Sequence, residues 1–139
     1  MQSFAPQTFT KNERLKSRKE ILRLMSRGSH AEYFPLTAKY AFGLHGEGVL
    51  STQDAAVNTI MVVVPKRLFK LAVDRNLLKR RMREAYRRNK QILPPCGASL
   101  SFTYAVKEKF PYSKIEKAVK AVLSDINNKV PKNDIPEDS

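Results

Sequence analysis

The sequence predicts one compact α+β domain, and three observations lead to this fold class. The chain has 139 residues, 42% of them hydrophobic, which suits a single domain with a core of its own. Segments whose apolar residues recur at helical spacing are interleaved with segments of alternating or continuous β-branched character. The formal net charge of +13 opposes compaction unless a polyanion is usually nearby, so nucleic acid is the first partner to test.

The first helix is predicted at residues 18–27. Ser17 and Glu20 have the spacing of a capping box, in which side chains satisfy backbone N–H groups at the start of a helix. Gly28 is a typical residue for the end of a helix. The apolar residues between these signals keep a helical period: Ile21, Leu22, Leu24 and Met25.

Strands are predicted in three places. From Leu36 the pattern has period two. One face of this strand carries Leu36, Ala38, Tyr40, Phe42 and Leu44, and the other carries Thr37, Lys39 and Ala41. Residues 45–58 indicate a loop, and residues 59–64 form a largely β-branched run typical of a central strand, which Pro65 ends. Residues 99–106 alternate again and predict a third strand.

Two further helices complete the predicted domain. A basic helix is expected at residues 72–91, before Pro94 and Pro95 force a break. A second capping box, Ser113 and Glu116, predicts the start of a final amphipathic helix. The apolar residues of that helix are Ile115, Val119, Val122, Ile126 and Val130. The expected order is α-β-β(-β)-α-β-α in a domain at residues 14–130, with flexible segments at 1–13 and 131–139.

Several function classes are excluded by composition. Residues 1–10 lack the apolar core of a signal peptide, and no apolar run approaches the roughly 18 residues of a membrane span, so we expect a cytoplasmic protein. A single cysteine, Cys96, excludes an internal disulfide and a cysteine-rich zinc site. The expected metal content of the protein itself is therefore none.

The basic helix is the strongest functional signal in the chain. Eleven basic residues stand between Lys66 and Lys90 against two acids, Asp74 and Glu84. A merely solvated helix normally mixes charges into i, i+4 pairs, whereas this one accepts like-charge repulsion. On a helical wheel, Leu78, Met82, Ala85 and Tyr86 form the face that can enter the core. The flank beside it is one predicted phosphate-binding surface of Arg75, Asn76, Lys79, Arg80, Arg83 and Arg87. For Arg81 and Arg88, on the opposite flank, a solvated face is the stronger interpretation.

At this helix the sequence resembles a known family. Residues 72–87, AVDRNLLKRRMREAYR, are similar to the signature of the bacterial ribonuclease P protein subunit, A-V-x-R-N-R-I-K-R followed by R-x-A-F/Y. The resemblance extends to the Arg-Leu-Lys run at 14–16, to Arg-Gly at 27–28 and to Val-Val-Pro-Lys-Arg at 63–67. Leu77 departs from the signature, which has arginine there, so one positive contact is expected to be missing.

The resemblance implies a fold, a role and a set of site residues. The fold is that of ribonuclease P proteins and the second domain of ribosomal protein S5, with a left-handed βαβ crossover in place of the usual right-handed one. The implied role is a protein cofactor of ribonuclease P, a monomer that binds the catalytic RNA and the 5′ leader of precursor tRNA. Hydrolysis then belongs to the RNA, which with the substrate phosphates holds Mg²⁺. The contacts to the catalytic RNA that it implies are Arg75, Asn76, Lys79, Arg80 and Arg83, with Lys66 and Arg67 as auxiliary phosphate contacts. Arg87 is predicted as an RNA-binding residue by its place on the same flank.

The resemblance also places the leader in a cleft between the first helix and the sheet. The cleft residues it implies are Ile21, Met25, Tyr40 and Phe42. Aromatic rings there can stack on bases, but alternating aromatics on a strand are also typical of a core, and both readings stay open for Tyr40 and Phe42.

The residues show no protein-borne catalytic centre. Hydrolysis by the protein would call for clustered carboxylates or a His pair, whereas His30 and His45 stand in loop-like segments far from the basic helix. The alternative functions are a ribosomal or ribosome-associated rRNA-binding protein, which would share the charge and size, and a helix-turn-helix DNA reader. The DNA reader fits poorly because residues 59–64 indicate a strand where a short helix is needed.

Overall fold

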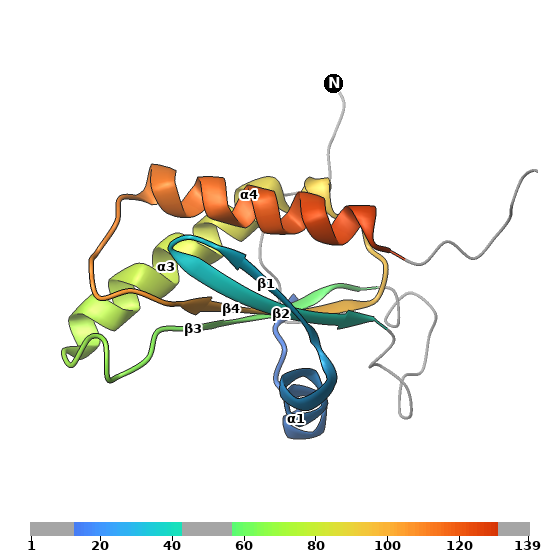
Figure 1. The fold of residues 1–139 in the computed structure, drawn as a ribbon, viewed down its shortest axis with the longest axis horizontal. Coiled ribbons are helices and arrows are strands. Elements are labelled where there is room, and N and C mark those ends of the chain that lie inside the picture. The colour runs from blue at the N-terminus through green and yellow to red at the C-terminus, as the bar shows by residue number, and fades with distance from the viewer. Residues whose placement is uncertain (1–12, 43–56, 131–139) are drawn as a thin grey trace, which may run out of the picture.

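The computed structural model describes residues 13–42 and 57–130, which form a four-stranded mixed sheet with helices on both faces (Figure 1). In chain order the elements are α1 (Arg18–Arg27), β1 (Ser29–Tyr33), β2 (Leu36–Phe42), β3 (Thr59–Val63), α3 (Ala72–Asn89), a 3₁₀ turn (Lys90–Ile92), β4 (Ala98–Tyr104) and α4 (Tyr112–Asn128). The α+β class and the element order are confirmed. Within the described residues, no helix is long and apolar enough to cross a membrane.

The strand order in the sheet is β1-β2-β4-β3. β1 pairs with β2 and β2 with β4 in antiparallel fashion, whereas β3 lies parallel to β4. Because parallel neighbours cannot be joined by a hairpin, the chain crosses from β3 to β4 through α3. This β3–α3–β4 unit is the crossover for which the resemblance implies a left-handed sense, and that sense stays a prediction.

The two faces of the sheet are covered differently. α3 and α4 lie over one face and α1 lies under the other (Figure 1). In the register, Tyr40 is opposite Leu100, and Leu100 is opposite Ile60. All three are buried in the main core with the apolar faces of α3 and α4. The intervening residues of each strand must therefore point toward α1.

β1 was not predicted as a strand. Its burial alternates weakly, and only Ala31 is buried, so the segment carries little of the apolar periodicity that identifies a strand. The strand exists because it pairs with β2 over its whole length, from Ser29 opposite Tyr40 to Tyr33 opposite Leu36. Pairing with β2 therefore decides the structure of this segment. With β1, three strands precede α3, as the predicted order α-β-β(-β)-α-β-α allowed.

β3 was predicted to suit a central position and instead lies at an edge of the sheet. The prediction of a central position was wrong. The run can be apolar at an edge because another segment covers part of that edge. The backbone N–H of Leu15 donates to the carbonyl of Ile60 at 2.8 Å, and Arg14 bridges to the same residue. The stretch before α1 thus pairs briefly with the outer side of β3.

The first predicted helix start is confirmed and the last is not. At α1, the Ser17 hydroxyl accepts from the backbone N–H of Glu20 at 3.3 Å. α4 begins at Tyr112 with Pro111 as N-cap, so Ser113 does not cap it. Glu116, the other residue of that expected capping box, instead accepts a hydrogen bond from Asn89 of α3 at 2.9 Å.

Asn58 joins the beginnings of β3 and β4. Its side-chain amide donates to the carbonyl of Leu93 at 3.0 Å and to that of Pro94 at 3.2 Å. Its side-chain oxygen accepts from the backbone N–H of Cys96 at 3.0 Å and of Ala98 at 3.1 Å. This buried side chain therefore holds the 93–98 turn against the start of the edge strand.

Some sequence predictions fall outside the described residues. These are the predictions on Leu44, on His45 and most of the 45–58 loop, on residues 1–12 and on the 131–139 tail. Glu13, expected in the flexible N-terminal segment, forms an ion pair with Lys90 at 2.9 Å.

Candidate nucleic-acid interface

The orientation of α3 is fixed by the face that it buries. Leu78, Met82 and Ala85 are fully buried and Tyr86 is 1% exposed, which confirms the predicted core face. Burial raises the pKa of the Tyr86 hydroxyl far above its ordinary value. Rotating the helix would bring this apolar stripe into water, so the charged stripes on its other sides are held in place.

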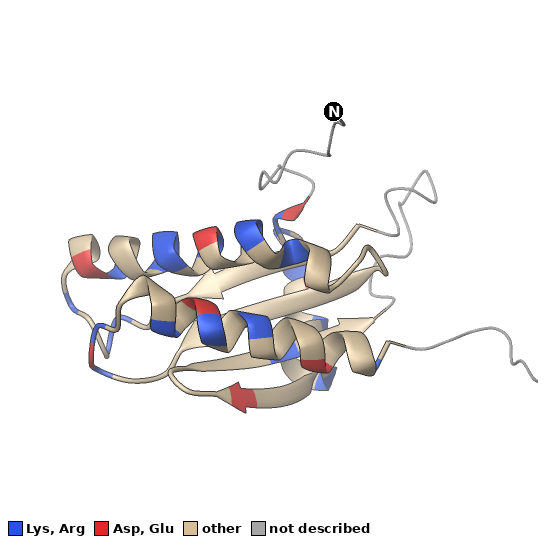
Figure 2. Cartoon of the chain, turned by 90° about the horizontal axis from the view of Figure 1, so that it is seen from above, with Lys and Arg blue, Asp and Glu red and all other residues tan. Residues whose placement is uncertain are grey.

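One stripe of α3 carries cations that no described protein group engages. We call Asn76, Lys79, Arg80 and Arg83 the β3-side flank, since helical spacing aligns them and Arg83 lies beside β3. Within residues 13–42 and 57–130, Lys79, Arg80 and Arg83 have no hydrogen bond or ion pair. Figure 2 shows how Lys and Arg recur along α3 with few acids between them. The flank is a positioned set of donors for an anion.

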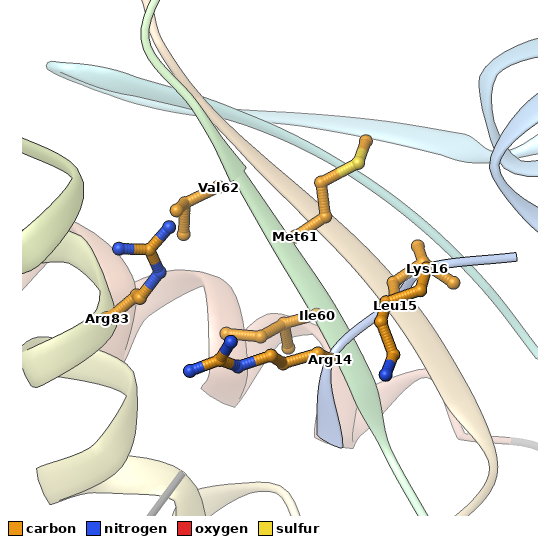
Figure 3. A pocket seen from close by; sticks show the side chains of 7 residues that line it. All are labelled: Arg14, Leu15, Lys16, Ile60, Met61, Val62 and Arg83. Atoms are coloured by element: carbon orange, nitrogen blue, oxygen red, sulfur yellow. The ribbon is translucent and has the colours of Figure 1, made fainter. Parts of the chain in front are cut away.

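A groove lies beside this flank at the outer edge of β3 (Figure 3). Its volume is about 240 Å³, and its lining residues are Arg14, Leu15, Lys16, Ile60, Met61, Val62 and Arg83. Arg83 comes from α3 and Arg14 from the segment before α1, and both side chains extend into the space beside β3. Burial and then the charge of Arg14 lower the pKa of the Arg83 guanidinium. An anion bound between these two guanidinium groups would lower their electrostatic repulsion.

Sequence reasoning did not name Arg14 and Lys16 as site residues. They are distant in sequence from the basic helix, and only the pairing of Leu15 with Ile60 brings them to the same edge. The available signal was the Arg-Leu-Lys run itself, which was read as part of a resemblance and not as a contact.

Two members of the predicted surface are engaged within the protein. Arg75 donates to the carbonyls of Phe69 and Lys70, each at 2.9 Å. Arg87 donates through Nε to Glu84 at 2.9 Å, and this hydrogen bond raises the pKa of Arg87 and lowers that of Glu84. The structure therefore separates these two arginines from the β3-side flank, although both remain partly exposed.

Lys66 and Arg67 lie exposed in the turn that leads from β3 to α3. The backbone N–H groups of Leu68 and Phe69 donate to the carbonyl of Pro65 at 3.1 and 3.3 Å. Phe69 is buried and packs edge-on against Tyr104 at 5.7 Å between ring centroids. This anchored turn, joined to α3 through Arg75, holds both cations at the N-terminal end of the helix.

The other flank of α3 faces α4 and is tied to it. Arg81 donates to the carbonyl of Phe110 at 2.6 Å, and the guanidinium carbon of Arg88 lies 6.0 Å from the ring centroid of Tyr112. The interpretation of Arg81 as merely solvated was therefore wrong. The α4-side flank, which we define as Asp74, Arg81 and Arg88, holds the two helices together.

Tyr40 and Phe42 do not lie in the predicted cleft with α1. Tyr40 is 4% exposed in the core under α4, and a hydrogen bond with its side chain is the first cause of the raised pKa of Lys129, just beyond that helix. Phe42 packs on the same core and lies edge-on to Tyr40, with 6.1 Å between ring centroids. Their placement in the cleft was wrong because the apolar row of β2 faces the larger helical layer.

Lys39 of β2 lies on the face of the sheet toward α1. Its amine donates to the carbonyl of Met25 at 2.6 Å. On α1, Ile21 is partly buried and Met25 is 36% exposed, and the backbone carbonyl of Met25 lies beside Lys39. Sequence reasoning did not single out Lys39, although its alternation with Tyr40 was visible in the sequence.

The α1-facing side of the sheet is polar near Lys39. Ser101 of β4 is opposite Lys39 on one side and Met61 of β3 on the other. The Ser101 hydroxyl is buried and has no hydrogen-bond partner in the described part of the chain. Of these three residues, Lys39 and Met61 are partly exposed, and the lysine amine is the group that can contact an anion.

The described residues offer recognition chemistry and no evident catalytic set. No group of three or more His, Cys, Asp or Glu that could hold a metal occurs in residues 13–42 and 57–130. His30 is paired with the exposed Glu32 at 3.2 Å. Burial raises the pKa of the Cys96 thiol, which makes it a poor nucleophile. The arrangement as a whole suits binding and positioning of a polyanion.

A small α+β domain with a core-anchored cationic helix beside a groove defines a class of polyanion-binding protein. The model of the ribonuclease P family matches residues 9–127 of this chain. Ribonuclease P protein components of two strains of Porphyromonas gingivalis are each 33% identical over 135 residues, which cover 91% of this chain and 93% of the relative. The chain belongs to the ribonuclease P protein family. This membership makes it a subunit of ribonuclease P, an endoribonuclease that acts in tRNA processing.

Solved structures agree on the fold. The ribonuclease P protein of Thermotoga maritima is 22% identical, with a TM-score of 0.65 over 81% of this chain and 96% of that one. The protein of Staphylococcus aureus is 18% identical, with a TM-score of 0.65 over 85% of this chain and 96% of that one. Family membership implies partnership with the RNA of ribonuclease P and with precursor tRNA.

Proposed function

We propose that this chain is the protein cofactor that docks on the catalytic RNA of ribonuclease P through α3 and holds the 5′ leader of precursor tRNA beside α1. One observation carries the first half of the proposal. Lys79, Arg80 and Arg83 lie on a helix whose rotation is fixed by burial, and they have no protein partner in the described residues. Guanidinium groups form forked hydrogen bonds with phosphate, so this flank matches an RNA backbone.

In this proposal the RNA carries out the chemistry. It holds Mg²⁺ together with the substrate phosphates, and the metal supplies the activated water for hydrolysis. The described carboxylates do not fit such a site, because they form no cluster of metal-ligating side chains and the acids of α3 are paired with cations, Asp74 with Lys109 and Glu84 with Arg87. The protein's own contribution is to screen phosphate repulsion and to position the leader. A cytoplasmic location is part of the same proposal.

Reconstitution tests the proposed role. The protein is added to the catalytic RNA at a Mg²⁺ concentration too low for the RNA alone, and 5′ maturation of precursor tRNA is followed. We expect cleavage to depend on the protein and to fail with an Arg80→Ala, Arg83→Ala double variant that is still folded. No stimulation by the wild-type protein, together with tight binding to ribosomal RNA, would instead support the ribosomal alternative.

We further propose that the leader runs along the α1-facing side of the sheet. Lys39 would contact a leader phosphate, with Ile21, Met25 and Met61 providing the apolar surface. This replaces the predicted stacking on Tyr40 and Phe42, whose rings lie in the core. The support is the position of Lys39, whose amine lies on this face of the sheet and reaches the Met25 carbonyl of α1.

A matched pair of variants tests this path. Lys39→Ala should weaken binding of leader-bearing precursor tRNA to the holoenzyme about fivefold and leave binding of mature tRNA unchanged, since one phosphate contact is lost. Tyr40→Phe, which removes only a hydroxyl on the opposite face, should change neither affinity. If Lys39→Ala binds both RNAs like the wild type, the leader does not contact this side chain.

A further inference from the structure

A second pocket lies at the other side of the domain, between the β1–β2 turn and α4. It has a volume of about 460 Å³ and is lined by Tyr33, Phe34, Lys114, Lys117, Ala118 and Ala121. Phe34, in the turn, is 58% exposed although it is aromatic. Its ring meets that of Phe110 edge-on, with 5.2 Å between centroids. An exposed ring braced by a second ring is a ready surface for stacking.

Cations surround this aromatic pair. The amine of Lys114 lies 5.5 Å from the ring centroid of Phe34 and 5.4 Å from that of Phe110. Lys117 lines the same pocket, and the lining includes no acid. A group that enters here therefore meets an aromatic surface and two ammonium groups. A nucleotide is complementary to both, because its planar base can stack on the ring and its anionic phosphate can pair with the ammonium groups.

The pocket is joined to α3 through the turn before α4. Phe110, which braces Phe34, accepts through its carbonyl from Arg81 of α3. Lys109 in the same turn pairs with Asp74 near the start of α3. The lining helix, α4, lies with α3 on the face of the sheet opposite α1 (Figure 1). The pocket is therefore on the same face of the sheet as α3, at the opposite edge from β3, and away from the proposed leader path.

We infer that this pocket binds an unstacked nucleotide of the catalytic RNA, with its base on Phe34 and its phosphate between Lys114 and Lys117. The inference rests on the proposed function, because it names a second contact to the same RNA. It adds a base-stacking contact to the phosphate contacts of the β3-side flank. Two separated contacts of different chemistry would fix the orientation of the domain on the RNA as well as its affinity.

Titration of the catalytic RNA with folded variants tests the inference. Phe34→Ala should weaken binding about tenfold, the scale of losing one base stack, and Phe34→Trp should bind like the wild type. Lys114→Ala should weaken binding and reduce the dependence of log affinity on log salt by about one phosphate contact. Lys120→Ala is the control, since Lys120 is an exposed lysine of the same helix that does not line the pocket.

Three outcomes would overturn the inference. Phe34→Ala could bind within twofold of the wild type, or the loss in Lys114→Ala could equal that in Lys120→Ala. Phe34→Ala could also convert a dimer of the free protein into a monomer, which would make the pocket an interface between copies. These results leave the proposed function standing if wild-type binding still requires Arg80 and Arg83. A wild-type protein that does not bind the catalytic RNA overturns both.

Discussion

The two flanks of α3 carry similar cations and use them differently. On the α4-side flank, Asp74 pairs with Lys109 at 3.0 Å and Arg81 donates to the carbonyl of Phe110 at 2.6 Å. On the β3-side flank, Lys79, Arg80 and Arg83 engage no other described residue. One stripe of charge holds the fold together and the other is left for a ligand.

The difference shows that charge density alone does not locate a binding surface. A helix that is basic on all its polar sides looks uniform in sequence, and only its neighbours decide which cations are already satisfied. Arg75 was predicted on the same flank as Arg80 and Arg83, yet it donates to the carbonyls of Phe69 and Lys70. An interface drawn from the sequence is therefore broader than the set of donors that remain for RNA.

The largest expected effect comes from removing the two arginine side chains of the β3-side flank. Arg80→Ala combined with Arg83→Ala should weaken binding to the catalytic RNA about 100-fold, because charge-assisted contacts of about 1.5 kcal/mol each are lost. The salt dependence should fall by about two phosphate contacts. Both side chains are exposed, so the midpoint of urea unfolding should not change.

A double variant of α1, Arg18→Ala with Arg23→Ala, removes the same charge from exposed positions on the other side of the sheet. It should bind the catalytic RNA nearly as well as the wild type. Equal losses in the two double variants would mean that only net charge matters and that α3 has no special position.

Arg81→Ala should give the reverse pattern. The carbonyl of Phe110 loses a charged donor, so the free energy of unfolding should fall by about 1–2 kcal/mol. Affinity for the catalytic RNA should stay within about threefold of the wild type. Urea unfolding and RNA titration of Arg81→Ala beside Arg80→Ala check this, and the comparison of flanks fails if Arg81→Ala is fully stable but binds RNA poorly.

Glu84→Gln should sharpen the comparison by releasing Arg87. With its partner neutralised, Arg87 can join the β3-side flank, so RNA affinity should rise about threefold and the salt slope by about one contact. Stability should change little, since both side chains of the pair are partly exposed and solvent screens their interaction. Glu108→Gln makes the same change of charge in the turn before α4, and an equal gain there would show that Arg87 is not recruited.

The smallest effect is expected from Glu116 at the α3–α4 contact. The hydrogen bond from Asn89, with that from the Tyr112 hydroxyl, lowers the pKa of Glu116. A carboxyl with a lowered folded-state pKa stabilises the fold above its unfolded pKa of about 4.3 and loses that contribution as the pH falls through the folded value. The stability difference between wild type and Glu116→Gln should shrink between about pH 5 and pH 2. A difference that is constant over this range would contradict it.

Much of the helical framework could be predicted because it depends on local signals. The Ser17 cap and the apolar stripe of α3 need only nearby residues, and both are confirmed. β1 escaped prediction because it has only one buried residue, Ala31, and takes its structure from β2. The edge position of β3 depends on Arg14 and Leu15 reaching back to it, which no local pattern indicates.

The candidate site shows the same limit. Alternation along β2 places Lys39 and Tyr40 on opposite faces, but it does not say which helix covers which face. The structure puts Tyr40 under α4 and Lys39 beside α1. The groove that joins Arg14 to Arg83 is assembled from segments far apart in the chain, and such a contact is beyond the reach of periodicity.

Asn58 has a consequence for how this chain tolerates changes in length. Its amide holds the start of β3 to the 93–98 turn. The alignment of β3 with β4 is therefore fixed by contacts of a residue that follows positions 43–56 in the chain. Doubling the length of a connection costs only about 0.6 kcal/mol in closure entropy. Evolution can therefore insert or delete residues between β2 and β3 and reshape that end of the molecule, while α3 and its cations keep their place.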